Sequence, residues 1–134
     1  MKSKNNNELI EFLDAYNECF LSKDIKKIRN FYSDENDELI YFDNHKNNDT
    51  YSVDEHIKLI SDFFANGKST ESGKVEEIKM ENITCFQSDN SACICFYSRY
   101  KSFPKPAIRS TLYIEKSNKL WKIKHAHYSF EPEK

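Results

Sequence analysis

The C-terminal segment from Trp121 to Ser129 constrains the fold most, because large apolar or imidazole side chains alternate in it with lysines. Successive residues of a strand point to opposite faces of a sheet, so this alternation predicts a strand with one buried face. The positions that share the inward face in this prediction are Trp121, Ile123, His125, His127 and Ser129. We therefore expect this strand to form the wall of a cavity, with both imidazoles inside it.

Apolar spacing and a capping residue predict two helices at the start of the chain. Leucines and aromatic residues recur every three or four positions over residues 8–21, which is the stripe of an amphipathic helix. Asp24 suits the N-cap of a short second helix, because its carboxylate can accept backbone N–H bonds. Residues 1–7 are polar, so we expect a disordered tail before a single domain over residues 8–134.

The remainder of the chain predicts a hairpin, a third helix and a meander of strands. Strand-forming residues over 38–43 lead through an Asn-rich turn to a very short strand near Tyr51. The Ser-x-x-Glu motif at residues 52–55 predicts the start of a helix that ends near Gly67. Four strands with short connectors follow, over residues 75–86, 92–103, 108–116 and 120–130. This order predicts an α+β fold with helices on one side of a bent sheet.

Composition argues against several functions. The net charge is −2 and the basic residues are spread along the chain, so we expect no nucleic-acid partner. No apolar run approaches the roughly 20 residues that span a bilayer, and the N-terminus has no hydrophobic signal region. We therefore expect a cytoplasmic protein without a membrane partner. Four cysteines lie in predicted helices or strands and are expected to be reduced: Cys19, Cys85, Cys93 and Cys95.

Three segments carry a resemblance to a known family. They are residues 91–97, residues 109–112 and, most specifically, residues 120–129. Together with the order of the predicted elements, they resemble the nuclear-transport-factor-two-like superfamily in its SnoaL-like branch. Within this branch the chain is similar to the association domain of calcium/calmodulin-dependent kinase II and its stand-alone bacterial relatives.

The resemblance implies a cystatin-like α+β roll, in which a strongly curved, mixed or antiparallel sheet wraps around the N-terminal helices. Such a cone-shaped domain has a cavity at its wide end. Ser98 and Leu112 stand where the kinase-type cavity has arginines, so an anion-binding cavity of that kind is not expected. The resemblance also implies a homodimer or higher homo-oligomer that forms through the outer face of the sheet. Positions expected at or beside this interface are Lys122, Lys124, Ala126 and Tyr128.

Candidate site residues come from the inward strand face and from the aromatic residues. We expect a ligand to contact Tyr41, Phe64, Phe96, Trp121, His125 and His127. His127 is one candidate general base, because imidazole titrates near neutral pH. Asp43 is the other, since a carboxylate in such a cavity can take a proton from the carbon next to a carbonyl. Their structural alternatives are a packed imidazole and a turn-capping aspartate. His56 and Asp62 are expected on a helix surface.

We expect no cofactor and no metal. The Cys-x-Cys motif at 93–95 and the His-x-His motif at 125–127 superficially resemble a mixed zinc site. The strand over 108–116 must lie between them, and two strand spacings of about 9.6 Å are too wide for one shared ion. A His-x-His pair with a carboxylate such as Asp43 stays an alternative.

These observations predict a small-molecule-binding SnoaL-like domain with an aromatic and histidine-lined cavity. One alternative is a cofactor-independent isomerase, dehydratase or cyclase that uses His127 or Asp43 as general base. The other alternative is an oligomeric assembly domain without catalysis.

Overall fold

The computed structural model describes residues 7–32, 38–44, 47–66, 77–102 and 104–132. Within these ranges the elements are α1 (Asn7–Leu21), α2 (Ile25–Arg29), β1 (Glu38–Phe42), β2 (Thr50–Ser52), α3 (Val53–Asn66), β3 (Ile78–Gln87), β4 (Ser91–Tyr100), β5 (Ile108–Ser117) and β6 (Leu120–Phe130). Of the predicted tail over residues 1–7, only Asn7 is described, and it begins α1. No helix in these ranges combines the length and apolar character needed to cross a membrane.

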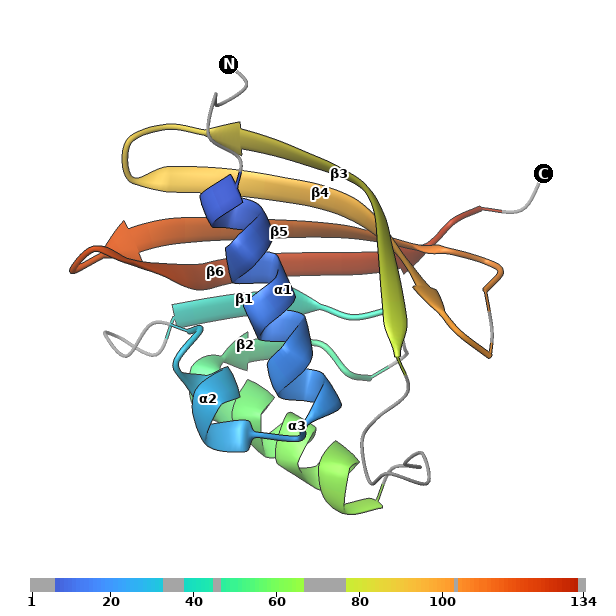
Figure 1. The fold of residues 1–134 in the computed structure, drawn as a ribbon. Coiled ribbons are helices and arrows are strands. Elements are labelled where there is room, and N and C mark those ends of the chain that lie inside the picture. Colours follow the sequence, from blue (N-terminus) through green and yellow to red (C-terminus); the bar gives the residue numbers. More distant parts are fainter. Residues whose placement is uncertain (1–6, 33–37, 45–46, 67–76, 103, 133–134) are drawn as a thin grey trace.

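Six strands form one sheet in the order β2-β1-β6-β5-β4-β3. Strands β3 to β6 pair antiparallel, as their short connectors predict, and β1 joins the other side of β6 in parallel. Figure 1 shows that the sheet curves, that α1 runs across the long strands, and that α2 and α3 lie together near the β1–β2 hairpin. The predicted α+β class with a curved sheet is confirmed.

The first two helices form where the sequence predicts them. In α1 the buried residues Leu9, Leu13 and Tyr16 recur every three or four positions, so one face of the helix packs against the sheet. Asp24 caps α2, because the backbone N–H of Lys27 donates to its carboxylate at 3.2 Å. The cap fixes the sharp turn between the helices.

The predicted Ser-x-x-Glu motif starts α3. The hydroxyl of Ser52 accepts from the backbone N–H of Glu55 at 3.1 Å. The Glu55 carboxylate accepts in turn from the backbone N–H of Tyr51 at 2.8 Å, one residue further back than in the standard capping box. These two hydrogen bonds connect the first turn of α3 to β2. The predicted end near Gly67 falls outside the described residues, and α3 is described to Asn66.

Strand β6 contains one residue more than its partner strand at mid-length. Ile123 pairs with Ile114 and His125 pairs with Tyr113, so Lys124 is an extra residue opposite β5. Such a bulge places two consecutive side chains on the same face and reverses the alternation beyond it. The inward set of β6 is therefore Trp121, Ile123, Ala126 and Tyr128.

The predicted facing of β6 is thus correct before the bulge and wrong after it. His125 and His127 lie on the outer face, and Ala126 and Tyr128, which we expected to face outward, lie on the inner face. The sequence pattern fails here because strict alternation assumes a regular strand.

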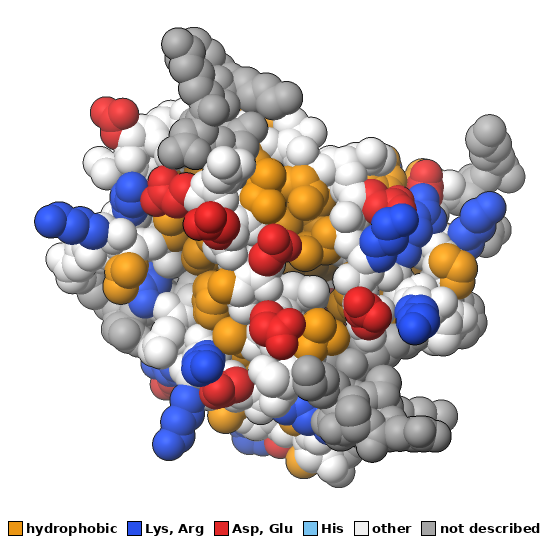
Figure 2. Space-filling model, viewed as in Figure 1, with side chains coloured by type: hydrophobic (Ala, Val, Ile, Leu, Met, Phe, Trp, Pro, Cys, Tyr) orange, Lys and Arg blue, Asp and Glu red, His pale blue; other side chains and the backbone are white. Residues whose placement is uncertain are grey.

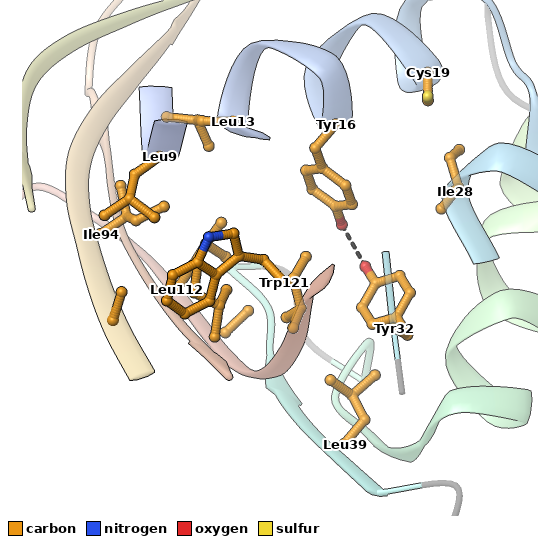
Figure 3. Packing of buried hydrophobic residues seen from close by; sticks show 14 of the residues in the cluster. Leu9, Leu13, Tyr16, Cys19, Ile28, Tyr32, Leu39, Ile94, Leu112 and Trp121 are labelled. Carbon is orange, nitrogen blue, oxygen red and sulfur yellow. Dashed lines mark hydrogen bonds between the residues drawn. The ribbon is translucent and has the colours of Figure 1, made fainter. Parts of the chain in front are cut away.

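One end of the core is built around Trp121. Its indole N–H donates to the Glu8 carboxylate at 2.9 Å, and the ammonium of Lys116 lies 5.0 Å from the ring centroid. Figure 3 shows the indole close to Leu9 and Leu112, on the opposite side of the view from Tyr32. Trp121 therefore faces inward as predicted, but it lies beside the start of α1 and not in the cavity wall.

Candidate functional site

A cavity of about 1110 Å³ lies between the helices and the concave face of the sheet. Its wall comes from α1, α3 and all the strands except β2, so residues far apart in sequence meet in it. The apolar part of the lining comprises Leu13, Phe20, Leu21, Leu59, Ile60, Phe63, Ile78, Met80, Phe96, Pro106, Ile108 and Phe130. The polar part comprises Tyr16, Asn17, Tyr41, Asp43, Asn44, Asn48, His56, Asp62, Ser98, Tyr100, Lys105 and Tyr128.

The cavity has an exposed mouth and a buried end. Exposed residues such as Phe63 of α3, Lys105 of the β4–β5 connection and Phe130 of β6 belong to the mouth. Tyr16 and His56 are buried and belong to the inner end. The cavity therefore opens to solvent at one end and closes on buried polar groups at the other.

A chain of buried hydrogen bonds supports the inner end. The hydroxyl groups of Tyr16 and Tyr32 are hydrogen-bonded (Figure 3). The Tyr32 hydroxyl also lies 3.1 Å from Nε2 of His56, whose Nδ1 is 3.1 Å from the Thr50 hydroxyl. All four side chains are buried. Because each polar group has a partner, the chain fixes the ring orientations without leaving a costly unpaired group.

Two further tyrosines complete the polar end. The Tyr41 ring lies against His56, with centroids 4.0 Å apart and planes at 32°, and 5.3 Å from the Tyr128 ring. Tyr41 comes from β1 and Tyr128 from β6 beyond the bulge. The bulge therefore brings a phenol, in place of an imidazole, to the cavity.

Burial of these groups opposes their ionisation. It raises the pKa of Tyr41 and of Tyr128, and the negative charge of Asp43 raises both pKa values further. Burial lowers the pKa of His56 to about 4, so the imidazole is neutral. The inner end thus offers hydroxyl and imidazole groups that can donate or accept hydrogen bonds, without a formal charge.

Asp43 is half-buried and lines the cavity near the two phenols. Its carboxylate accepts from the Asn48 side-chain amide at 3.3 Å. Its backbone N–H donates to the Asp49 carboxylate at 2.9 Å, which organises the turn after β1. Asp43 combines the two positions that its sequence context suggested: a cavity-wall position, and a position in the turn after a strand.

Of the four predicted aromatic site residues, Tyr41 and Phe96 line the cavity and the other two do not. Phe64 packs beside it, 6.0 Å from the ring of Phe20, while its neighbour Phe63 supplies the lining side chain. Trp121 is absent from the lining, because it lies at the far end of α1.

The prediction that both β6 imidazoles face the cavity is wrong. Nδ1 of His125 donates to the backbone carbonyl of Ile40 at 2.8 Å, across the parallel pairing with β1. His127 is exposed. The Phe42 ring lies against both imidazoles, at centroid distances of 5.6 Å and 5.7 Å. These contacts belong to the outer face of the sheet.

His56 lines the cavity, although it was expected on the surface of the helix. The structure buries it, with 2% of its surface exposed. Its spacing carried a signal, because His56 lies three residues after Val53 and four before Ile60, both of which are buried. Asp62 also lines the cavity, but it is exposed and pairs with Lys58 at 3.2 Å.

Comparison with known proteins gives a consistent assignment of fold. A family model described as a SnoaL-like domain matches residues 9–132. No curated protein matches the chain in sequence. The chain is similar to an NTF2-like protein of unknown function from Pseudomonas putida KT2440, with a TM-score of 0.81 and 14% identity over 96% of this chain and 89% of that one.

Two other solved structures are similar. One is a putative calcium/calmodulin-dependent protein kinase II association domain from Xanthomonas campestris, with a TM-score of 0.73 and 19% identity over 98% of this chain and 91% of that one. The other is a protein of unknown function with a cystatin-like fold from Nostoc punctiforme PCC 73102, with a TM-score of 0.74 and 8% identity over 98% and 95%. The TM-scores show a shared fold, and at identities this low the similarity shows the fold alone.

The burial of His56 predicts a loss of stability in acid. Its pKa of about 4 in the folded protein is below the unfolded value near 6.5, so the unfolded state binds the proton first as the pH falls. The contribution of His56 to the free energy of unfolding is fully present above about pH 6.5 and is lost as the pH falls from there to about pH 4. Between pH 7 and pH 5 the loss is about 2 kcal/mol. Urea denaturation of wild type and His56→Gln at both pH values measures this loss.

In His56→Gln the part of the pH dependence due to this imidazole should disappear. The matched control is His127→Gln, which removes an exposed imidazole and should keep the wild-type loss. Equal losses in wild type and His56→Gln would show that His56 is not buried in its neutral form.

Proposed function

Because the chain belongs to the SnoaL-like domain family, we propose that it binds a small, largely apolar and uncharged molecule in its cavity. The observation that carries the proposal is the cavity itself, which has about 1110 Å³ of space, apolar walls and converging polar groups at its inner end. Binding sites for small molecules typically have volumes of about 300 to 1,000 Å³ and this division of apolar and polar lining. The size suits a ligand of several rings or a long acyl chain.

The charges around the cavity favour an uncharged ligand over an anion. Figure 2 shows acidic side chains over the face where α1 lies, with hydrophobic side chains between them, and Glu11, Asp14 and Glu18 on this helix are exposed. Among the described lining residues Asp43 and Asp62 are acidic, against one basic residue at the mouth. This field repels anions.

The inner end favours a ligand with a carbonyl or hydroxyl group. The phenols of Tyr16, Tyr41 and Tyr128 are buried and uncharged, and burial raises the pKa of each, so their hydroxyl groups can exchange hydrogen bonds with a ligand oxygen. A ligand whose oxygen formed one of these hydrogen bonds would be fixed in orientation while its apolar body contacted the walls.

Partly filling the cavity should weaken binding. Ser98 is buried in the wall, and Ser98→Leu places a larger apolar side chain in the space. We expect the neutral dye Nile red to bind wild type and to bind this variant at least about tenfold more weakly, a loss of about 1.4 kcal/mol. Ser129→Leu makes the same change on the strand position after Tyr128 and should bind as wild type does.

A panel of apolar ketones and alcohols should then include compounds that displace the dye and raise the melting temperature of wild type alone. Equal dye binding by wild type and Ser98→Leu would contradict the proposal.

A second candidate function is proton transfer next to a ligand carbonyl, with Asp43 as general base. The observation that favours it is the position of Asp43 in the cavity wall, close enough to Tyr41 and Tyr128 for its charge to raise both pKa values. A carboxylate that takes a proton while neutral phenols hydrogen-bond the carbonyl is a known way to form an enol. The isomerase, dehydratase and cyclase alternatives all begin with such a step.

Exchange of carbon-bound hydrogen measures this activity directly. With a bound ketone in deuterated water, wild type should speed exchange at the carbon next to the carbonyl, and Asp43→Asn should slow it at least about 100-fold. The control Asp62→Asn removes another carboxylate from the cavity lining and should keep the rate. Exchange that survives in Asp43→Asn would exclude this base.

The outer face of the sheet suits a homodimer or higher homo-oligomer. Ile40, Tyr51 and Phe86 are 47%, 63% and 51% exposed, and exposed apolar side chains of this size on a sheet face favour association. We expect wild type to sediment at a multiple of the chain mass, and Ile40→Glu with Phe86→Glu to sediment as a monomer. The control Leu120→Glu charges an exposed residue at the start of β6 and should associate as wild type does. A monomeric wild type would contradict this assembly.

A further inference from the structure

Two thiols lie side by side on the outer face of the sheet. Strand β4 alternates regularly: Ala92, Ile94 and Phe96 are buried in the core, and Cys93 and Cys95 between them face outward and are half-buried. The same sheet separates these thiols from the cavity, so they take no part in the proposed ligand site.

The spacing of the two sulfur atoms matches that of a metal chelate. Sγ of Cys93 and Sγ of Cys95 are 3.9 Å apart. Two thiolates bound to one Zn²⁺ at about 2.3 Å in tetrahedral geometry lie about 3.8 Å apart. An ion could therefore bind both sulfurs with little movement of the strand.

A disulfide between the same residues is much less compatible with the strand. Residues two apart on one strand are separated by about 6.7 Å along its axis, and their side chains project in parallel. A disulfide needs Cβ atoms about 3.5–4.5 Å apart, so its formation would distort β4 and its pairing with both neighbours. Cys93 and Cys95 are accordingly free thiols in the structure.

Uncharged side chains surround the pair. Phe86 and Thr84 of β3 lie opposite Cys93 and Cys95 on one side. On the other side, Tyr113 and Thr111 of β5 are their partners. Two threonines therefore flank Cys95, two aromatic residues flank Cys93, and both thiols are half-buried.

The imidazoles of β6 are too far from Cys93 and Cys95 to bind the same ion. Strand β5 lies between the thiols and these imidazoles, with Tyr113 facing His125 and Thr111 facing His127. In the described part of the chain no third His, Cys, Asp or Glu joins such a cluster. The remaining coordination positions of an ion would be open to water, a small anion or a second molecule.

We propose that Cys93 and Cys95 form a two-thiolate binding site for a soft metal ion, of the class of Zn²⁺ and Cd²⁺. The site is independent of the proposed small-molecule function, because it lies on the opposite face of the sheet. Soft thiolate ligands select ions of this class over Mg²⁺ or Ca²⁺.

The ion must displace protons from the thiols. Burial raises the pKa of Cys93 to about 11, with a further contribution from the neighbouring Cys95. Apparent affinity therefore rises with pH, by up to about tenfold per unit for each proton displaced. The titratable groups on the adjacent β5 positions are Tyr113, whose hydroxyl donates to Glu115 at 2.5 Å, and Arg109.

Titration of the reduced, full-length protein with Cd²⁺ tests the site. The thiolate-to-cadmium absorption in the ultraviolet should grow to saturation at one ion per chain, or at one ion per two chains if two copies share it. Cys93→Ser and Cys95→Ser should each weaken binding at least about 100-fold, since each removes half of the protein ligands. Both thiols are half-buried, so circular dichroism should show both variants folded.

The controls Cys19→Ala and Cys85→Ala remove the two buried thiols and should leave the titration unchanged. Mg²⁺ should give no competition, and Zn²⁺ should displace Cd²⁺. The proposal is overturned if either single serine variant retains wild-type affinity, if binding follows Cys19 or Cys85, or if mass spectrometry shows that Cys93 and Cys95 form a disulfide in the folded protein. Dye binding in the cavity should be unaffected in all of these variants, so failure of one proposal does not imply failure of the other.

Discussion

The one-residue bulge at Lys124 determines which side chains of β6 face the helices. Before it, Ile123 pairs with the segment after α2, where its backbone N–H donates to the Phe31 carbonyl at 2.7 Å. After it, β6 pairs in parallel with β1, and the Lys124 ammonium lies 3.4 Å from the Glu38 carboxylate. The extra residue allows β6 to pair with the segment after α2 on one side of the bulge and with β1 on the other. It also turns Tyr128 toward the cavity.

The inner end of the cavity depends on this arrangement. Tyr128 from β6 meets Tyr41 from β1, and Tyr41 lies against His56 from α3. The hydrogen bond between His56 and Tyr32 then connects α3 to the segment after α2. An unpaired buried polar group costs about 1–3 kcal/mol, so these groups are stable inside the domain only because each has its partner. The same contacts hold neutral donors at the end of an apolar space.

Local features were predictable from the sequence, and features set by distant contacts were not. The stripe of α1, the Asp24 cap and the Ser52 motif act within a few residues, so their patterns identify them. The bulge at Lys124 has no local signature, and the face of every later residue in β6 depends on it. Tyr41, Asp43 and Phe96 line the cavity, and the side on which they lie is set by β1, the turn after it and β4, not by the alternation within β6.

The facing of β6 beyond the bulge is tested most directly by nuclear Overhauser contacts between assigned aromatic rings. With Lys124 as the extra residue, the Tyr128 ring should show contacts to the Tyr41 ring, whose centroid is 5.3 Å away. The His127 ring should show contacts to Phe42, at 5.7 Å. Contacts from His127 to Tyr41, with the Tyr128 ring in solvent, would contradict the bulge and the cavity built on it.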